Sequence, residues 1–213
     1  VWCDLTVTAQ IEDMARRAAE HYGRIDILVN NARAIIGRDR VPVTDLREEV
    51  WDRFLRITTT AVFLATRSVG RIMIEKGNGG RIINMASDAA KRGRARTAAY
   101  NASKFAVIGL TQASAMDLAP HRITVNAVCP GPVNTDRMNY WEAEQAQAKG
   151  MSLEAFRATI VSDGGKGVPL GRIAEASDEL RTTADLFADV GDRLEQAHTQ
   201  GTLAQLNHSI GEL

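Results

Sequence analysis

The sequence predicts an α/β domain in which helices cover both faces of a parallel sheet. Three short apolar segments alternate with longer helical stretches, a pattern that implies right-handed βαβ crossovers. The chain has 213 residues, of which 45% are apolar, and this is enough for one sizeable core. We therefore expect residues 1–213 to form a single domain.

The first predicted helix begins after a capping Thr8 and ends at Gly23, because apolar residues between them recur at helical spacing. The apolar segment 25–30 comes next and stops at two asparagines. A short apolar run of this kind is typical of a strand that is buried on both faces.

A long helix is predicted from about Leu46 to Lys76, and the β-branched residues 58–60 are expected to weaken it locally. Residues 81–87 form the second expected strand. Thr97 can cap the helix that follows, which is predicted from about Ala98 to Leu118, and Pro120 lies just beyond its end.

The third expected strand covers residues 123–128 and ends at Cys129-Pro130-Gly131-Pro132, where two prolines prevent further pairing. Residues 137–168 form an insertion that is either a mobile substrate lid or a surface helical hairpin. From Glu175 onward no further strand is expected. Because ligands of parallel sheets bind beyond the carboxyl ends of the strands, the segments 30–33, 87–96 and 129–135 are where chemistry is expected.

Charge and composition exclude several classes of function. The 26 basic and 26 acidic residues balance, so no global field favours nucleic acid or an acidic membrane surface. No uncharged stretch approaches the ~20 apolar residues of a membrane span. Cys3 and Cys129 form no disulfide framework, the four histidines show no metal-ligand spacing, and we expect a cytoplasmic protein without a metal. The first residues lack signal-peptide features and an initiator Met, so we expect the chain to begin inside a gene product.

Tyr100 and Lys104 are four residues apart on a predicted helix, so their side chains emerge on one face. A nearby ammonium stabilises a phenolate, and the pair is then suited to general acid–base chemistry. Ser87, thirteen residues before Tyr100, ends a predicted strand and can contribute its hydroxyl. The alternatives are a surface tyrosine beside a solvated lysine, and a serine that only caps the next turn.

In this context the sequence resembles the short-chain dehydrogenase/reductase family from Asp4 to about Arg172. The matching pieces are, in chain order, Asp4-Leu5, Ile27 to Ala32, Trp51-Asp52-Arg53, Gly80 to Asn84, Ser87, Tyr100 to Lys104, Val125 to Thr135, and Pro169 to Arg172.

The resemblance implies a Rossmann-like, doubly wound, three-layer αβα domain that binds NAD or NADP and moves a hydride between its nicotinamide and an alcohol or carbonyl carbon. By similarity, Tyr100 exchanges the proton, Lys104 stabilises its phenolate and holds the nicotinamide ribose, and Ser87 hydrogen-bonds the substrate oxygen.

The resemblance also implies cofactor contacts along the chain. Asp4 and Leu5 match the adenine contact, and Asn30 and Ala32 match the turn on the adenosine side. A further turn matches the segment that carries the nicotinamide carboxamide and a phosphate, and its residues are Pro130, Gly131, Val133 and Thr135. The alternatives are structural: Asn30 only bridges backbone groups, and Pro130-Gly131 only ends a strand.

The sequence departs from the family pattern at four places, one of which is the region after Arg172, where the family's last strand and its Asp-Gly-Gly ending are absent. No glycine-rich turn follows any strand, although such a turn cradles the pyrophosphate. We therefore expect the chain to be N-terminally incomplete, with two strands and two helices preceding Val1 in complete members, and the chain alone to bind nucleotide poorly and to expose strand edges. Arg33 stands where the family has glycine. Thr58 stands where it has the catalytic asparagine, whose backbone carbonyl holds a relay water, and we expect Thr58 to take this role with altered geometry.

The loop 91–96 holds a lysine and three arginines, Arg92, Arg94 and Arg96. The absence of interleaved aromatic residues argues against nucleic acid. The loop is either a solvated segment or a contact for a carboxylate, sulfonate or phosphate on the substrate.

We therefore predict an NAD(P)-dependent short-chain dehydrogenase/reductase that acts on a small alcohol or carbonyl compound, which is anionic if the arginines contact it. The family implies a homotetramer or dimer, for which the helices 46–76 and 98–118 offer apolar surface. The alternative is a truncated or non-catalytic scaffold that binds a partner without turnover.

Overall fold

The computed structural model describes residues 1–34, 40–162 and 174–175. The chain divides into two compact units, residues 1–129 and residues 130–213, which are described one after the other. No helix within the described ranges is long and apolar enough to cross a membrane.

The first unit contains a three-stranded parallel sheet. Its strands are β1 (Ile27–Asn30), β2 (Gly80–Met85) and β3 (Ile123–Val128), in the spatial order β1-β2-β3. All three predicted strands are present, and their parallel pairing confirms the predicted α/β class.

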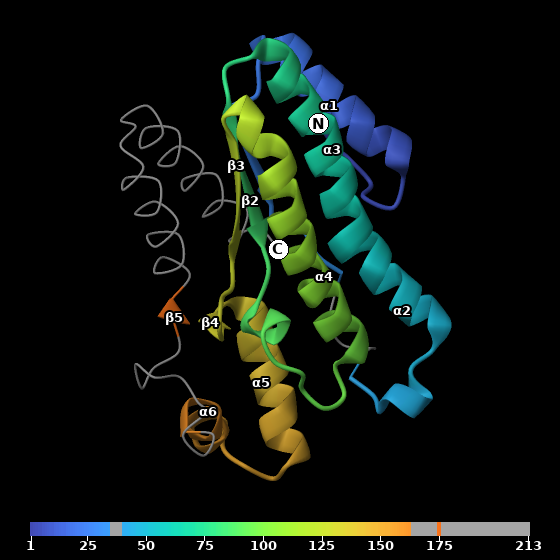
Figure 1. Cartoon of the computed structure of the whole chain (residues 1–213). Helices are drawn as coiled ribbons and strands as arrows, with labels where there is room; N and C mark the ends of the chain where they lie inside the picture. Colours follow the sequence, from blue (N-terminus) through green and yellow to red (C-terminus); the bar gives the residue numbers. More distant parts are fainter. Residues whose placement is uncertain (35–39, 163–173, 176–213) are drawn as a thin grey trace. The chain divides into compact units, whose positions relative to one another are not determined.

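Three helices lie side by side over one face of this sheet: α1 (Thr8–Tyr22), α3 (Ala61–Lys76) and α4 (Ala98–Leu118) (Figure 1). The core between these helices and the sheet is a cluster of buried apolar residues, namely Ala15, Val69, Met73, Ile82, Ile123 and Val125. Burial alternates along β3, where Ile123 and Val125 are buried and Thr124 and Asn126 are exposed. Packing against the helices therefore stabilises the sheet through this face.

The prediction that the segment 25–30 is buried on both faces is wrong. All four residues of β1 are only half-buried, because β1 has a single neighbour, β2, among the described strands. Residues 1–4, which precede α1, pair with no described strand.

The long helix predicted from Leu46 to Lys76 is interrupted at its threonines. It consists of α2 (Glu48–Leu55), a π-helical segment η2 (Arg56–Thr60) and α3, and a separate 3-10 turn, η1 (Val43–Asp45), precedes it. In η2 the backbone N–H of Ala61 donates to the carbonyl of Arg56, five residues earlier. The expected local weakening at the β-branched run is thus a change of helix type.

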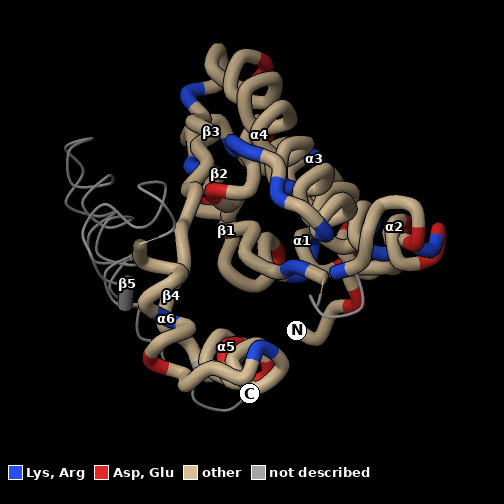
Figure 2. The backbone as a smooth tube through the Cα atoms, turned by 90° about the horizontal axis from the view of Figure 1, so that it is seen from below, with Lys and Arg blue, Asp and Glu red and all other residues tan. Residues whose placement is uncertain are grey.

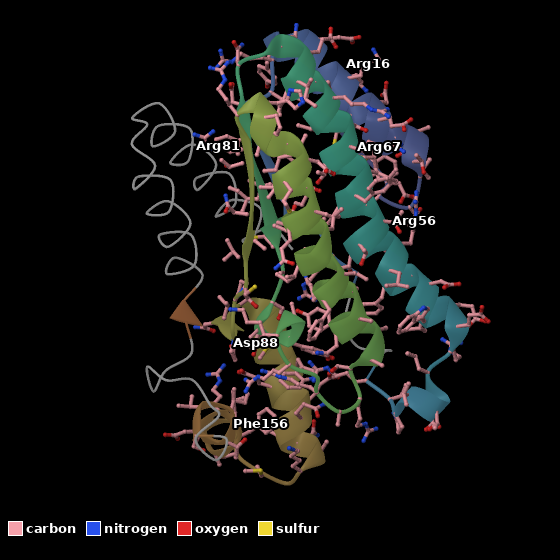
Figure 3. All side chains as sticks on the ribbon, in the orientation of Figure 1. Arg16, Arg56, Arg67, Arg81, Asp88 and Phe156 are labelled. Atoms are coloured by element: carbon pink, nitrogen blue, oxygen red, sulfur yellow. The ribbon has the colours of Figure 1, made fainter. Side chains whose placement is uncertain are left out.

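Two predicted helix caps are absent. Thr8 is the first residue of α1, and no side-chain hydrogen bond caps that helix. The Thr8 hydroxyl instead accepts a hydrogen bond from Arg56 Nη2 (3.0 Å), which reaches the start of α1 from the π-helical segment (Figure 3). Thr97 precedes α4 but also makes no capping bond to it. Gly23 ends α1 as predicted, in the left-handed conformation (φ 78°) that glycine adopts without strain.

The first unit has two further short 3-10 turns. The turn η3 (Asp88–Ala90) follows β2, and the turn η4 (Ala119–His121) joins α4 to β3. Pro120 lies in the second of these, just past the end of α4 as the sequence predicts.

The second unit contains α5 (Asp136–Ala148), α6 (Leu153–Ser162) and a short parallel pair, β4 (Val133–Asn134) with β5 (Ala174–Glu175). The two helices form a hairpin, in which the rings of Trp141 and Phe156 meet edge to face at 5.9 Å. The pair β4–β5 was not predicted, because two-residue strands beside prolines leave no periodic signal. Whether the insertion 137–168 acts as a lid stays a prediction, and its residues 163–168 lie outside the described residues.

Candidate active site

The carboxyl ends of β1, β2 and β3 lie together in the first unit, and Figure 2 looks onto this edge of the sheet. Ser87 follows β2 by two residues and is buried, with 7% of its surface exposed. Its Oγ accepts from the backbone N–H of Ala89 (3.2 Å) and donates to Asp88 Oδ1 (3.2 Å). Ser87 therefore caps the next turn, which is the structural alternative for this residue. Its hydroxyl can still accept one further hydrogen bond.

Lys104 is the cationic residue among the predicted catalytic residues, and it is buried, with 3% exposure. Its ammonium donates to the carbonyl of Met85, at the end of β2. Burial, helped by the positive charge of Arg33 and opposed by Cys129, lowers the pKa of Lys104 to about 8. Arg33 follows β1 and Cys129 follows β3, so Lys104 lies at the carboxyl ends of all three strands.

Tyr100 lies one turn before Lys104 on α4 and is half-buried. Its side chain packs against a cluster that contains Ala34, Phe54 and Ala99. Since residues four apart on a helix share a face, Tyr100 and Lys104 emerge on the same side of α4. The alternative of a solvated lysine beside a surface tyrosine does not fit a lysine this deeply buried.

Thr58 lies in the middle of the π-helical segment and is almost fully buried. Its Oγ1 accepts a hydrogen bond from the backbone N–H of Ala34 (3.3 Å). The neighbouring Thr59 donates to the carbonyl of Ser103 on α4 (3.1 Å). Thr58 is thus placed beside the cluster that holds Tyr100, and its part in a proton relay stays a prediction.

Asn101 is a site residue that the sequence analysis missed. It is buried, and its Nδ2 donates to the carbonyls of Ala89 (2.7 Å) and Arg92 (2.8 Å). These bonds tie the loop after Ser87 to the first turn of α4. An asparagine inside a helix, directly after Tyr100, was the available signal, because its side chain seeks nearby backbone groups.

Asn30 bridges side chains across the sheet. Its Nδ2 donates to Asn84 Oδ1 (2.8 Å) and to Thr66 Oγ1 (3.3 Å), and Asn84 in turn donates to Thr111 on α4 (2.9 Å). A structural role for Asn30 is therefore present, although through side chains rather than backbone groups. The predicted cofactor role of Asn30 and of the exposed Ala32 stays a prediction.

Asp4 and Leu5 also have structural contacts. The Asp4 carboxylate accepts from the backbone N–H (2.8 Å) and the hydroxyl (2.7 Å) of Thr6, and these hydrogen bonds lower the pKa of Asp4. Leu5 packs on a core cluster that includes Ile11 and Leu64. Their proposed contacts to adenine stay predictions.

The remaining predicted cofactor residues belong to the second unit. Val133 lies in β4, and the Thr135 hydroxyl caps α5 by accepting from the backbone N–H of Met138 (3.3 Å). Pro130 and Gly131 precede β4. Their cofactor roles stay predictions.

Comparison with known proteins shows which family these residues belong to. The model of the short chain dehydrogenase family matches residues 1–146, so the chain belongs to this family. Within it, the chain is similar to galactitol 2-dehydrogenase of Agrobacterium fabrum, with 38% identity over 175 residues, which cover 82% of this chain and 66% of that relative. The chain therefore spans just under two thirds of the relative's length.

Solved structures agree with this family. Sorbitol-6-phosphate 2-dehydrogenase of Erwinia amylovora matches with a TM-score of 0.79 and 30% identity over 91% of this chain and 72% of that one. An actinorhodin polyketide ketoreductase with NADPH matches with a TM-score of 0.76 and 33% identity over 92% and 71%. Structures of this kind have been solved with NAD+ and with NADPH bound.

Burial of the Lys104 ammonium predicts a pH-dependent cost to stability. The pKa of Lys104 is about 8 in the fold and 10.5 in a free lysine, so between these values the unfolded chain binds more protons. The free energy of unfolding should therefore rise with pH across this window, by roughly 3 kcal/mol at most. Urea denaturation is measured from pH 7 to 10.5. Over this range the free energy of unfolding of the wild type should rise by this amount relative to that of Lys104→Met. Lys91→Met, at an exposed lysine, is the matched control. If the free energies of unfolding of the wild type and of Lys104→Met changed in parallel with pH, the burial of the Lys104 ammonium would be contradicted.

Proposed function

We propose that the protein is an NAD(P)-dependent oxidoreductase that interconverts an alcohol and a carbonyl compound. One observation carries the proposal: a buried lysine at the carboxyl ends of three parallel strands, one helical turn from a tyrosine and anchored to the strand that leads to a serine. Ligands of parallel sheets bind at this edge, and perturbed lysines gather at functional sites. The family and its dehydrogenase and reductase relatives support the same activity.

Tyr100, Lys104 and Ser87 each have a separate role in the proposed reaction. The Tyr100 phenol exchanges a proton with the substrate oxygen, and the Lys104 ammonium stabilises the phenolate through its positive charge. Ser87 contacts the same oxygen, which gains negative charge during carbonyl reduction. The nicotinamide, when bound, supplies or accepts the hydride.

The residues fit the two halves of the cofactor unequally. Lys104 is a buried donor suited to the hydroxyls of the nicotinamide ribose. None of the described strands is followed by a glycine-rich turn that could cradle the pyrophosphate. The ribose and nicotinamide contacts are therefore the part of cofactor binding that we assign to this sequence.

Two further properties belong to the same proposal. A cytoplasmic location is supported by Cys3 and Cys129, which are both free thiols. A homo-oligomer, either a dimer or a tetramer, is supported by exposed apolar side chains on α3 and α4. These two helices lie side by side (Figure 1). Phe63 lies on α3, and Phe105 and Met116 lie on one stripe of α4, with 46% and 80% exposure. An apolar patch of this kind on neighbouring helices suits a second copy of the chain.

The substrate class can be narrowed through the loop 91–96, and we propose that Arg96 contacts an anionic group on the substrate. Arg92 and Arg94 both pair with Asp88. Arg96 is exposed and, among the described residues, has no ion pair. Its φ of 61° lies in the left-handed region, which costs a non-glycine residue about 1–2 kcal/mol.

The proposed proton exchange is tested with Tyr100→Phe. We expect kcat to fall at least ~100-fold, since the phenol hydroxyl is lost, while nucleotide affinity followed by tryptophan fluorescence changes little. Tyr22→Phe, an exposed tyrosine on α1, is the control and should keep full activity. If Tyr100→Phe retained wild-type turnover, the proposed function would be wrong.

The oligomer is tested with the double variant Phe105→Glu and Met116→Glu. Two carboxylates in an apolar interface should convert the assembly to monomers, which light scattering measures directly. Val43→Glu, at another exposed apolar residue, should leave the mass unchanged. A wild-type protein that is monomeric at micromolar concentration would overturn the proposal.

The anionic contact is tested with Arg96→Gln. We expect KM to rise about two- to tenfold for substrates that carry a carboxylate or phosphate, and to stay unchanged for neutral analogues. Lys91→Gln, in the same loop, should affect neither class. An equal change in KM for anionic and neutral substrates would exclude the contact.

A further inference from the structure

Asp88 joins the proposed catalytic serine to two arginines. It directly follows Ser87 at the end of β2, and Figure 3 labels it there. Its Oδ1 accepts a hydrogen bond from Ser87 Oγ (3.2 Å). Its Oδ2 accepts from Arg92 Nη2 (3.3 Å) and from Arg94 Nη2. The carboxylate is therefore shared between Ser87 on one oxygen and two cations on the other.

The hydrogen-bonding capacity of Ser87 is almost used up by these contacts. A hydroxyl has one proton and two lone pairs. The proton of Ser87 points to Asp88, and one lone pair accepts from the backbone N–H of Ala89 (3.2 Å). The second lone pair is what remains for a substrate, so Ser87 is held as an acceptor.

This state of Ser87 distinguishes the two forms of a substrate. In a complex that cannot react, the alcohol keeps its hydroxyl proton and can donate it to the remaining lone pair while Ser87 keeps its bond to Asp88. A carbonyl has no proton to donate, so Ser87 must first turn its own proton away from Asp88. The bond to Asp88 therefore favours the alcohol over the carbonyl.

The two arginines limit this preference. A guanidinium that binds Oδ2 draws negative charge away from Oδ1, so each of them weakens the acceptor that holds the Ser87 proton. The loop that carries them is fixed, since the Thr97 hydroxyl donates to the carbonyl of Arg94 (2.9 Å) and Asn101 donates to that of Arg92 (2.8 Å). Arg92 and Arg94 are thus held where they can act on Asp88.

We propose that Asp88 is a positioning residue that biases Ser87 toward the alcohol form of the substrate, and that Arg92 and Arg94 set the strength of this bias. The inference rests on the proposed function, because it assigns the substrate oxygen to Ser87. A purely structural role of Asp88 in the loop predicts no difference between alcohol and carbonyl.

The test compares the dissociation constants of both forms of one substrate in complexes that cannot react: the carbonyl with oxidised nucleotide and the alcohol with reduced nucleotide. In Asp88→Ala the ratio of the carbonyl constant to the alcohol constant should fall about three- to tenfold, the range of a hydrogen bond to a partly exposed charge. In Arg94→Gln the same ratio should rise, because Asp88 then holds the Ser87 proton more strongly. Asp117→Ala, an exposed carboxylate at the end of α4, should leave the ratio unchanged.

An unchanged ratio in Asp88→Ala, or a change of the same direction in both variants, would overturn the inference. If Asp88→Ala fails to fold, the rise in Arg94→Gln still decides the matter. A wild-type protein with nucleotide-dependent turnover but an unaltered ratio in the variants rejects the role of Asp88 alone. A wild-type protein without such turnover rejects the proposed function together with it.

Discussion

The arrangement of the site depends on one buried ammonium. Lys104 is 3% exposed, its ammonium donates to the carbonyl of Met85, and the nearby charge of Arg33 has the same sign. Removing a cation from water is unfavourable unless it is well paired, so the fold loses stability at neutral pH by holding it there. Packing of α4 on the sheet compensates for this cost. A local feature that lowers stability at the carboxyl edge of a parallel sheet is typical of a functional site.

The π-helical segment in the middle of the long helix connects two parts of the site. A regular helix satisfies its backbone internally, whereas the π-helical segment places consecutive threonines toward two different neighbours. Thr58 accepts from the loop after β1, and Thr59 donates to the backbone of α4 between Tyr100 and Lys104. The segment thus connects the end of one strand to the helix that carries the proposed proton-exchange pair. β-branched residues make such an interruption less costly, because they favour the regular helix less than unbranched residues such as Ala or Leu do.

Local patterns predicted most of the fold but only part of the site. The spans of α4 and β3 follow from apolar periodicity and from the proline and threonine beside them, and the observed bounds agree closely. The burial of β1 was not predictable in this way, because it depends on which strand lies on its other side. Thr8 and Thr97 were expected to cap helices, yet tertiary contacts with Arg56 and with the loop after Ser87 use their hydroxyls instead. Tyr100, Lys104 and Ser87 have a recognisable spacing, whereas Asp88 and Asn101 act through contacts that only the folded loop creates.

The basic loop after Ser87 shows why a run of like charges is not by itself a binding surface. The sequence places four cations within residues 91–96, and a count of charges alone favours a strong anion site. In the fold, one carboxylate that precedes the loop takes up two of the arginines and connects them to Ser87. Two exposed cations remain in the loop, Lys91 and Arg96, and the backbone of Arg96 is left-handed. Paired arginines then act on the chemistry of the serine, and an outward arginine is left to act on the substrate, so one loop can serve both positioning and specificity.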